Sequence, residues 1–211
     1  MDAFFGGQPR GPRSRTRRGQ DAIMRIEVDL NEAVFGTERE LQVETAVVCP
    51  TCTGSCCAPG TSPAQCGICR GRGAVQSMQR SLLGNVMTSR PCSACQGYGQ
   101  TLPVPCPECA GEGRVLARRS IAVRVVAGVD TGTRIQLAGQ AEAGPGGGPN
   151  GDLYVEVVVR PHEIFERRGH DLHARLSVPM TSAALGTTLT LDTLDGPREV
   201  MLEPGTQAGQ S

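Results

Sequence analysis

The feature that most constrains this chain of 211 residues is a set of four Cys-x-x-Cys pairs between residues 49 and 109. A glycine follows each pair after one residue, and in three pairs a second glycine comes two residues later. Two residues between cysteines make a tight turn that can place both sulfur atoms on one metal ion. Glycine lets the backbone turn with a positive φ angle, where a side chain would clash. In the first pair, Cys56 stands in place of the second glycine.

These eight cysteines predict two bound Zn²⁺ ions, because four thiolates complete one tetrahedral site. The spacing alone leaves the partition of the pairs open, since neighbouring, alternating and nested arrangements all supply four sulfur atoms to each ion. Residues 81–86 form an apolar, hairpin-like stretch, and a hairpin there favours the nested arrangement. The first pair would then lie beside the fourth, and the second beside the third.

The zinc ions are expected to stabilise the fold rather than to catalyse a reaction. A site closed by four thiolates has no open position for water or substrate, so the sequence does not predict an enzyme. Residues 49–113 contain only seven of Val, Leu, Ile and Phe, too few for a core that offsets the chain entropy. Metal binding would stabilise this segment instead. Cys56 and Cys57 are left over and are interpreted as spare thiols in a loop.

The residues on either side of the cysteine-rich segment have the pattern of a β protein. A more continuously apolar stretch at 153–159 predicts a central strand. Two short helical turns are expected at 30–35 and 181–185, each ending before a glycine. Apolar and polar residues alternate, as in half-buried strands, at 24–28, 41–45, 121–125, 172–178 and 189–193.

The β part also contains an internal repeat. A shift of 150 residues places the sequence AVFGT at 33–37 on AALGT at 183–187, and a shift of 77 places GVDTG at 128–132 on GTQAG at 205–209. The cysteine-rich segment is inserted in the first copy. The second copy stops before the counterpart of its last strand, so a truncated second copy is expected.

The first 20 residues are rich in Arg, Gly and Pro and are predicted to form a flexible arm. The glycine-rich stretch at 144–149 lacks the Gly-Lys-Ser/Thr ending of a phosphate loop and is predicted to be a flexible loop. No stretch approaches the ~20 apolar residues of a membrane span, and the arm lacks the apolar part of a secretory signal. Metal-binding cysteines are typical of a reducing compartment, so a cytoplasmic location is expected. The zero net charge gives no general basis for binding nucleic acid or a membrane.

The cysteine repeats and the motifs around them resemble the type I DnaJ (heat-shock-protein-40) co-chaperones. The resemblance covers residues 21–211, and FFGG at 4–7 is similar to the end of the family's Gly/Phe linker. Besides Cys-x-x-Cys-x-Gly-x-Gly, it rests on DLNEAVFG at 29–36, GVDTG at 128–132, NGDLYV at 150–155 and PHEIF at 161–165.

The resemblance implies a mainly β fold with two tandem β-sandwich-like client-binding domains, the second truncated. A cysteine-rich double-zinc finger with β-hairpin arms would be inserted in the first. The expected parts are a linker at 1–20, a first β domain at 21–48 plus 114–162, the zinc finger at 49–113 and a second β domain at 163–211.

The resemblance also implies nested zinc ligands and a client-binding groove. An extended segment of unfolded polypeptide would add to a sheet edge of the first domain, beside an apolar pocket. Ordinary core packing is the alternative for Val43 and Ile121. The expected pocket residues are Leu41, Val43, Ile121 and Phe165. The expected ligands are Cys49, Cys52, Cys106 and Cys109 for one zinc ion and Cys66, Cys69, Cys92 and Cys95 for the other.

In such a family the chain would bind non-native polypeptides, prevent their aggregation under stress and pass them to a DnaK-type ATPase chaperone. The family's J domain, with its His-Pro-Asp loop, and its C-terminal dimerisation segment have no counterpart in the 211 residues. The resemblance therefore implies a fragment that is monomeric, although the full-length protein is expected to be a homodimer.

Two other functions remain as alternatives. A zinc-dependent nucleic-acid-binding module is suggested by the basic arm and the zinc turns, although Tyr98 is the only aromatic residue of the finger available for base stacking. A thiol–disulfide exchange protein is suggested by Cys-x-x-Cys, because thiols in that motif can have a lowered pKa.

Overall fold

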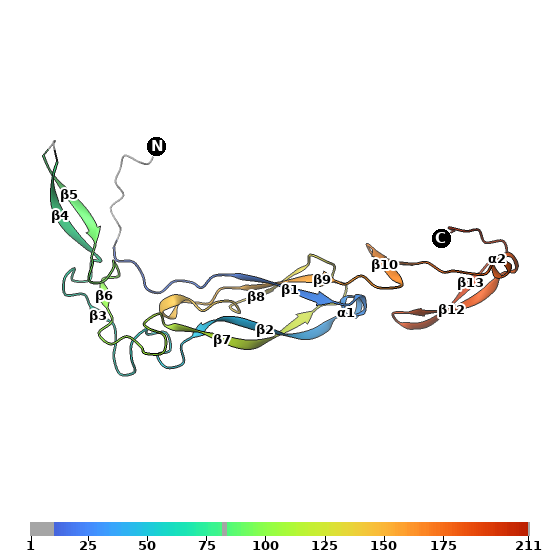
Figure 1. Cartoon of the computed structure of the whole chain (residues 1–211), viewed down its shortest axis with the longest axis horizontal. Helices are drawn as coiled ribbons and strands as arrows, with labels where there is room; N and C mark the ends of the chain where they lie inside the picture. Colours follow the sequence, from blue (N-terminus) through green and yellow to red (C-terminus); the bar gives the residue numbers. More distant parts are fainter. Residues whose placement is uncertain (1–10, 82–83, 211) are drawn as a thin grey trace. The chain divides into compact units, whose positions relative to one another are not determined.

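The computed structural model of the chain describes residues 11–81 and 84–210 (Figure 1). Strands joined by turns make up most of its regular structure, which confirms the predicted mainly β class. The N-terminal half contains β1 (Ala22–Val28), α1 (Leu30–Phe35), β2 (Thr37–Val48), β3 (Ala64–Gln65), β4 (Ala74–Ser81), β5 (Gly84–Pro91) and β6 (Gln100–Thr101). The C-terminal half contains β7 (Arg114–Val125), β8 (Arg134–Leu137), η1 (Pro145–Gly147), β9 (Leu153–Val159), β10 (Phe165–Arg168), β11 (Asp171–Ala174), α2 (Met180–Leu185), β12 (Thr187–Thr193) and β13 (Gly196–Leu202).

Two sheets carry most of the apolar core. One has the order β1-β9-β8, with β9 in the centre as its continuous apolar sequence predicted, and the other pairs β2 with β7. Alternate residues of these strands are buried, because successive side chains of a strand point to opposite faces. The largest fully buried aliphatic side chains are Val28, Val123, Val125, Leu153, Val155 and Val157.

The cysteine-rich segment contains two short antiparallel ribbons, and β2 leads into it while β7 leads out. One ribbon pairs β3 with β6, and the other pairs β4 with β5, in a register that sets Met78 opposite Met87. The β4–β5 pairing confirms a hairpin where the sequence suggested one. Leu82 and Leu83 of the predicted hairpin stretch lie outside the described residues, as does the Phe-Phe-Gly-Gly motif near the N-terminus.

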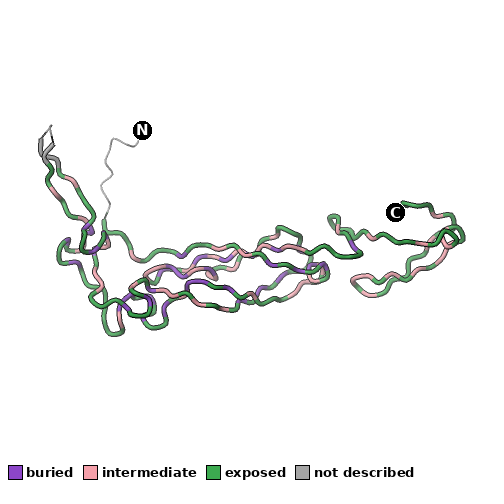
Figure 2. Tube along the Cα trace, in the orientation of Figure 1, coloured by how far each residue is buried: buried purple, intermediate pink, exposed green. Residues whose placement is uncertain are grey.

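The chain consists of two compact units, each built from segments that are separate in the sequence. The first comprises residues 1–26, 39–123 and 134–156 and includes the whole cysteine-rich segment. The second comprises 27–38, 124–133 and 157–211 and includes both helices. Among the described residues after Val157, only Phe165 is buried (Figure 2).

The internal repeat found in the sequence is also a structural repeat within the second unit. Both helices end before a glycine with nearly the same backbone, with φ and ψ of 82° and 157° at Gly36 and of 78° and 150° at Gly186. In the first copy, the backbone N–H of Gly128 donates to the carbonyl oxygen of Ala33 at 2.8 Å. The same hydrogen bond recurs in the second copy from Gly205 to Ala183 at 2.9 Å.

One predicted strand is shorter than its sequence pattern. Alternation over 172–178 predicted a strand of that length, but β11 ends at Ala174, where its partner β10 begins with Phe165. A strand needs a partner for its backbone hydrogen bonds, and the register leaves none on β10 for the residues that follow. Leu176 accordingly remains exposed.

Candidate metal centres

The four Cys-x-x-Cys pairs share one backbone turn. After the second cysteine of each pair comes a residue with φ between 47° and 52°, and the following glycine has φ between 83° and 89°. The glycines therefore occupy positions that the turn requires, as the spacing predicted. The non-glycine residues with positive φ in these turns are Thr53, Arg70, Gln96 and Ala110.

The first candidate metal centre consists of Cys49, Cys52, Cys106 and Cys109, whose side chains are all buried. The Sγ atoms of Cys49 and Cys106 are 3.9 Å apart, and those of Cys52 and Cys109 are 3.6 Å apart. Cys49 directly follows β2, and Cys106 and Cys109 precede β7. This group of cysteines thus joins the two ends of the cysteine-rich segment, next to β2 and β7.

The second candidate metal centre consists of Cys66, Cys69, Cys92 and Cys95, which are also buried. Its sulfur distances repeat those of the first centre: 3.9 Å from Cys66 to Cys92 and 3.6 Å from Cys69 to Cys95. These four cysteines flank the β4–β5 hairpin. The structure therefore brings the pairs together in the nested order, the first with the fourth and the second with the third.

Both groups of sulfur atoms fit a tetrahedral Zn²⁺ ion. Sulfur atoms at ~2.3 Å from a central Zn²⁺ lie ~3.8 Å from one another in a tetrahedron, and the observed separations are 3.6 and 3.9 Å. All four ligand atoms of each group lie within 4.8 Å of one another. Each group can hold one metal ion, and a purely sulfur donor set suits Zn²⁺.

Backbone hydrogen bonds around each centre have an approximate twofold pattern. In the second centre, Cys66 donates its backbone N–H to Gly99, and Cys92 donates to Gly73, both at 2.9 Å. In the first centre, Cys49 donates to Gly113 at 3.1 Å and Cys106 donates to Cys56 at 3.0 Å. Cys56 therefore occupies the position that a glycine fills in the other three turns.

Cys56 adopts an unfavourable backbone conformation in that position. Its φ angle is 67°, close to the 72°, 73° and 79° of Gly73, Gly99 and Gly113. Those three glycines also donate their N–H groups to the second cysteine sulfur of their own turn, at 3.2 to 3.3 Å. Hydrogen bonds of this kind stabilise a thiolate and orient it toward a metal. Cys56 and Cys57 are both buried, and neither belongs to one of the two four-cysteine groups.

The protonation of the thiols depends strongly on their surroundings. Burial raises the pKa of the Cys49 thiol to about 12 and that of Cys69 to about 11. The backbone N–H of Cys69 lowers the pKa of Cys66 to about 7. Without a cation, Cys49 and Cys69 thus keep their protons at neutral pH, because burial disfavours the charged thiolate. A metal ion that binds there must displace those protons.

The predicted client residues lie partly in different units. Leu41 and Val43 are on β2, and Ile121 is on the paired strand β7, all in the first unit, whereas Phe165 begins β10 in the second. Val43, Ile121 and Phe165 are only 7 to 8% exposed, and Leu41 is half-buried. On the opposite face of these strands, Ser120 donates to Glu40.

Sequence reasoning missed the role of residues 11–20, which we call the N-terminal strap. The strap lies against the cysteine-rich segment and the glycine-rich stretch 144–149, and a Cβ atom on Gly146 would come 2.7 Å from the carbonyl oxygen of Arg15. Glycine is therefore needed there for the close approach of two backbones. Hydrogen bonds run from backbone N–H groups of the strap to carbonyl oxygens: Arg13 to Gly97, Arg17 to Pro145 and Gly19 to Pro149.

None of the helices in the described part of the chain has the length and apolar character needed to cross a membrane.

Comparison with known proteins identifies the family. The DnaJ C-terminal domain matches residues 16–211. The chain is 64% identical over 212 residues to Chaperone protein DnaJ 2 of Streptomyces avermitilis, an alignment that covers 100% of the chain and 56% of that protein. It is 56% identical over 210 residues to Chaperone protein DnaJ of Leifsonia xyli, covering 99% and 57%, and 51% identical over 212 residues to Chaperone protein DnaJ 2 of Mycobacterium leprae, covering 99% and 56%.

The chain thus spans just over half the length of the curated relatives that it matches. The match extends from the strap through both four-cysteine groups and both copies of the β repeat, and it confirms the resemblance drawn from the sequence motifs. The chain belongs to the DnaJ C-terminal domain family.

Proposed function

We propose that this chain is the client-binding core of a DnaJ chaperone, which binds segments of non-native polypeptides and prevents their aggregation. The observation that supports this most strongly is the family match over residues 16–211 together with two buried four-cysteine groups. The wider role is part of the same proposal: transfer of clients to a DnaK-type ATPase in the cytoplasm, by a full-length homodimer.

In this function the two Zn²⁺ ions are structural. Four sulfur ligands close each site, so no position is left for water or a substrate. Their contribution is the folding of a segment that buries cysteines in place of aliphatic side chains. Structural zinc contributes on the order of 10 kcal/mol to such small modules.

The client would add as an extended strand to the edge of β2. Within the described residues, β2 pairs with β7 in a sheet of two strands, and a long strand with an unpaired edge is a template for another chain. Main-chain hydrogen bonds would provide affinity without strict sequence preference. Near the end of β2, the carbonyl of Ala46 already accepts a hydrogen bond from Ala143 at 2.8 Å, so the available edge lies before that residue.

Leu41 is the residue of β2 that would contact an apolar side chain of the bound client. It shares a face with Val43 because residues two apart in a strand point the same way, but it is the more accessible of the two. Val43 and Ile121 are buried, so they would form the support beneath the client side chain rather than an open surface. Phe165 is also buried, within the second unit, so it offers no open surface to a client side chain.

Suppression of aggregation tests this function. A chemically denatured protein is diluted into buffer with an excess of the zinc-loaded chain, and light scattering is followed. We expect scattering to fall with the wild-type chain and with Gln42→Glu, which adds a charge on the opposite, exposed face of β2. Leu41→Glu adds the same charge on the client face and should lose most of the effect. Undiminished aggregation in the presence of the folded wild-type chain would contradict the proposal.

A further inference from the structure

A pocket of about 220 Å³ lies where the N-terminal strap meets the cysteine-rich segment and the glycine-rich stretch. All of its lining residues belong to the first unit, and none belongs to the β2 edge proposed to bind clients. Three of them are arginines, Arg15 and Arg17 from the strap and Arg114 at the start of β7. The remaining lining residues are Cys56, Tyr98, Gly111, Glu112, Pro145 and Gly146.

Arg15 is held in place and retains an unused donor. Its guanidinium carbon lies 4.3 Å from the centre of the Tyr98 ring, and its Nη2 donates to the carbonyl of Gln100 at 3.1 Å. Its Nε is buried and has no hydrogen-bond partner in the described part of the chain. Buried donors are almost always satisfied, so this N–H is suited to an acceptor supplied by a ligand.

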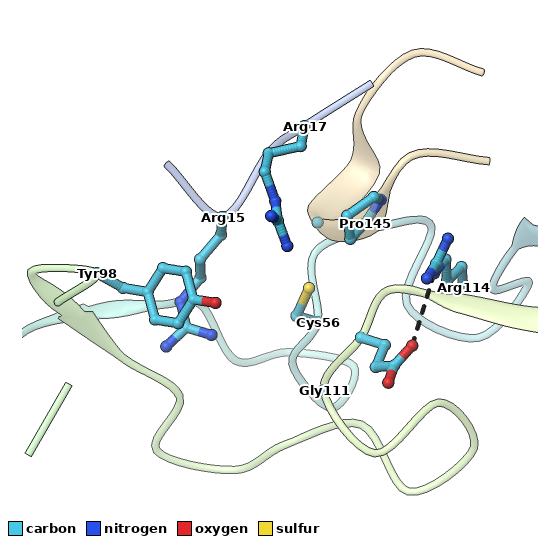
Figure 3. Close-up of a pocket in the computed structure, with 9 residues that line it drawn as sticks. Arg15, Arg17, Cys56, Tyr98, Gly111, Arg114 and Pro145 are labelled. Carbon is cyan, nitrogen blue, oxygen red and sulfur yellow. Dashed lines mark ion pairs between the residues drawn. The ribbon is translucent and has the colours of Figure 1, made fainter. Parts of the chain in front are cut away.

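Arg17 supplies a second free cation. Its backbone N–H is bonded to Pro145, and Figure 3 shows its side chain extending into the pocket toward Cys56. Within residues 11–81 and 84–210, its guanidinium has no ion-pair or hydrogen-bond partner. A positive side chain directed into a pocket without a counter-charge attracts an anion.

The acidic groups near the pocket are already engaged with the third arginine. Arg114 contacts the carboxylate of Glu112 at 3.5 Å and that of Glu142 at 3.4 Å, and Figure 3 shows the pair between Arg114 and the lining carboxylate. Arg15 and Arg17 are therefore left without a neutralising carboxylate in the pocket. The net charge around the pocket is therefore positive, although the formal net charge of the whole chain is zero.

The size and lining of the pocket indicate which anion it can hold. Its volume is below the ~300 to 1,000 Å³ of pockets that enclose whole cofactors or drug-sized molecules, so it suits a single side chain. Pro145, Gly146 and Gly111 provide an uncharged wall beside the arginines. A glutamate side chain has the matching form, with an apolar stem and a carboxylate that guanidinium groups bind through paired hydrogen bonds.

We propose that this pocket binds the carboxylate of an acidic side chain, preferably glutamate, in an extended polypeptide segment. Arg15 and Arg17 bind the carboxylate, and Tyr98 holds Arg15 in position. The site forms only when the strap is docked, since the strap contributes both arginines. Acidic-peptide binding therefore stabilises the docked strap.

The test is an NMR titration of the zinc-loaded chain that observes the arginine Nε–H signals. Arg15→Gln identifies the signal of Arg15. The probes are a short capped peptide with the sequence Gly-Glu-Glu-Gly, the same peptide with Gln in place of Glu, and inorganic phosphate. We expect the Glu peptide to shift the Arg15 signal and the Gln peptide to leave it unchanged. Arg17→Gln should weaken binding about tenfold, the loss expected for one hydrogen bond between charged groups.

Arg13→Gln is the matched control, because it removes the same charge from the strap outside the pocket. It should leave the affinity for the Glu peptide within about twofold of the wild-type value, since exposed charges contribute little at moderate salt. Equal affinity for the Glu and Gln peptides would overturn the proposal, as would an unchanged affinity in Arg17→Gln. If phosphate bound as tightly as the Glu peptide, the pocket would be a site for small free anions, and the peptide assignment would be wrong.

Discussion

The Sγ atoms of Cys52 and Cys109 lie 3.6 Å apart, although 57 positions separate the two residues in the chain. Cys66 and Cys92 of the second centre are separated by only 26 positions. The first centre therefore closes the whole cysteine-rich segment at its base, and the second closes the inner loop with the β4–β5 hairpin. Because the two centres are nested, loss of one should affect a different part of the chain than loss of the other.

Double substitutions distinguish the nested arrangement from its alternatives. Cys52→Ser combined with Cys109→Ser removes two ligands from one centre and should leave one zinc ion per chain. Cys52→Ser combined with Cys66→Ser removes one ligand from each centre and should lower the affinity of both. Native mass spectrometry after mild chelation counts the ions. Cys57→Ser is the control, since Cys57 belongs to neither group, and it should retain two. One firmly held ion in the Cys52/Cys66 variant would indicate neighbouring pairing.

Loss of the first centre should disturb the sheet of β2 and β7 more than loss of the second centre. Cys49 directly follows β2, and its N–H bonds to Gly113, the residue before β7. Without a metal ion in the first centre, the cysteines no longer hold the ends of β2 and β7 together. Hydrogen exchange should therefore accelerate at these ends in Cys52→Ser but not in Cys69→Ser, where the faster exchange should stay within the finger. Equal effects on β2 in both variants would argue against the nested roles.

Cys56 provides a test of backbone strain. Its φ angle of 67° is unfavourable for a residue with a Cβ atom, at a cost of about 1 to 2 kcal/mol. Cys56→Ala removes the thiol and keeps the Cβ, whereas Cys56→Gly also removes the strain. We expect the Gly variant to be more stable than the Ala variant by about 1 kcal/mol, measured by denaturant unfolding of the zinc-loaded chain. At a position with an ordinary backbone conformation, the Gly variant is the less stable of the two. If Cys56→Gly were less stable than Cys56→Ala, backbone strain at Cys56 would be contradicted.

The turns that carry the cysteines could be predicted from the sequence, because local requirements determine the residue type at each of their positions. Cysteines two residues apart and glycines at positive φ define the turn without reference to the rest of the chain. The strands at 24–28 and 121–125 and the helix at 30–35 were predicted for the same reason, since alternation and a terminal glycine are local signals. The second helical turn was likewise predicted from its own terminal glycine, Gly186, although α2 begins at Met180, one residue earlier than expected.

The strap and its pocket could not be predicted, because backbone groups make most of the contacts. The bond from Arg17 to Pro145 involves only N–H and carbonyl atoms, which almost every residue type offers. The close approach at Gly146 leaves a signal in the sequence, a glycine-rich stretch, but the same signal is typical of a flexible loop. The burial of Cys56 and Cys57 likewise depends on segments that meet only in the folded chain.

Asp152 should make stability depend on pH. The backbone N–H of Gly139 donates to its carboxylate at 2.8 Å, and Gln136 and Arg18 contact it at 3.0 Å. These contacts hold the pKa of the Asp152 carboxyl below its usual value, with the hydrogen bond from Gly139 as the main cause. The unfolded chain then binds the proton more readily, so the stabilisation is complete above the unfolded pKa of ~3.9 and is lost as pH falls through the lower folded pKa.

Asp152→Asn should therefore unfold at a lower temperature than the wild type at pH 7, and the difference should shrink below about pH 4. Thermal unfolding of both proteins at each pH measures this difference, and effects of acid on the metal centres cancel in the comparison. Asp192→Asn, which changes an exposed carboxylate, should show little difference at either pH. A constant gap between Asp152→Asn and the wild type from pH 7 to pH 3 would contradict the assignment.

The most direct test of the account is hydrogen exchange on the zinc-loaded chain with and without a reduced, carboxymethylated polypeptide that stays unfolded. If clients add as a strand to β2, amides between Thr37 and Thr45 should exchange more slowly in the complex, and Leu41→Glu should abolish that protection. Slower exchange confined to other segments would contradict the β2 edge as the binding site. The absence of protection at a saturating concentration of the polypeptide would contradict client binding by this chain.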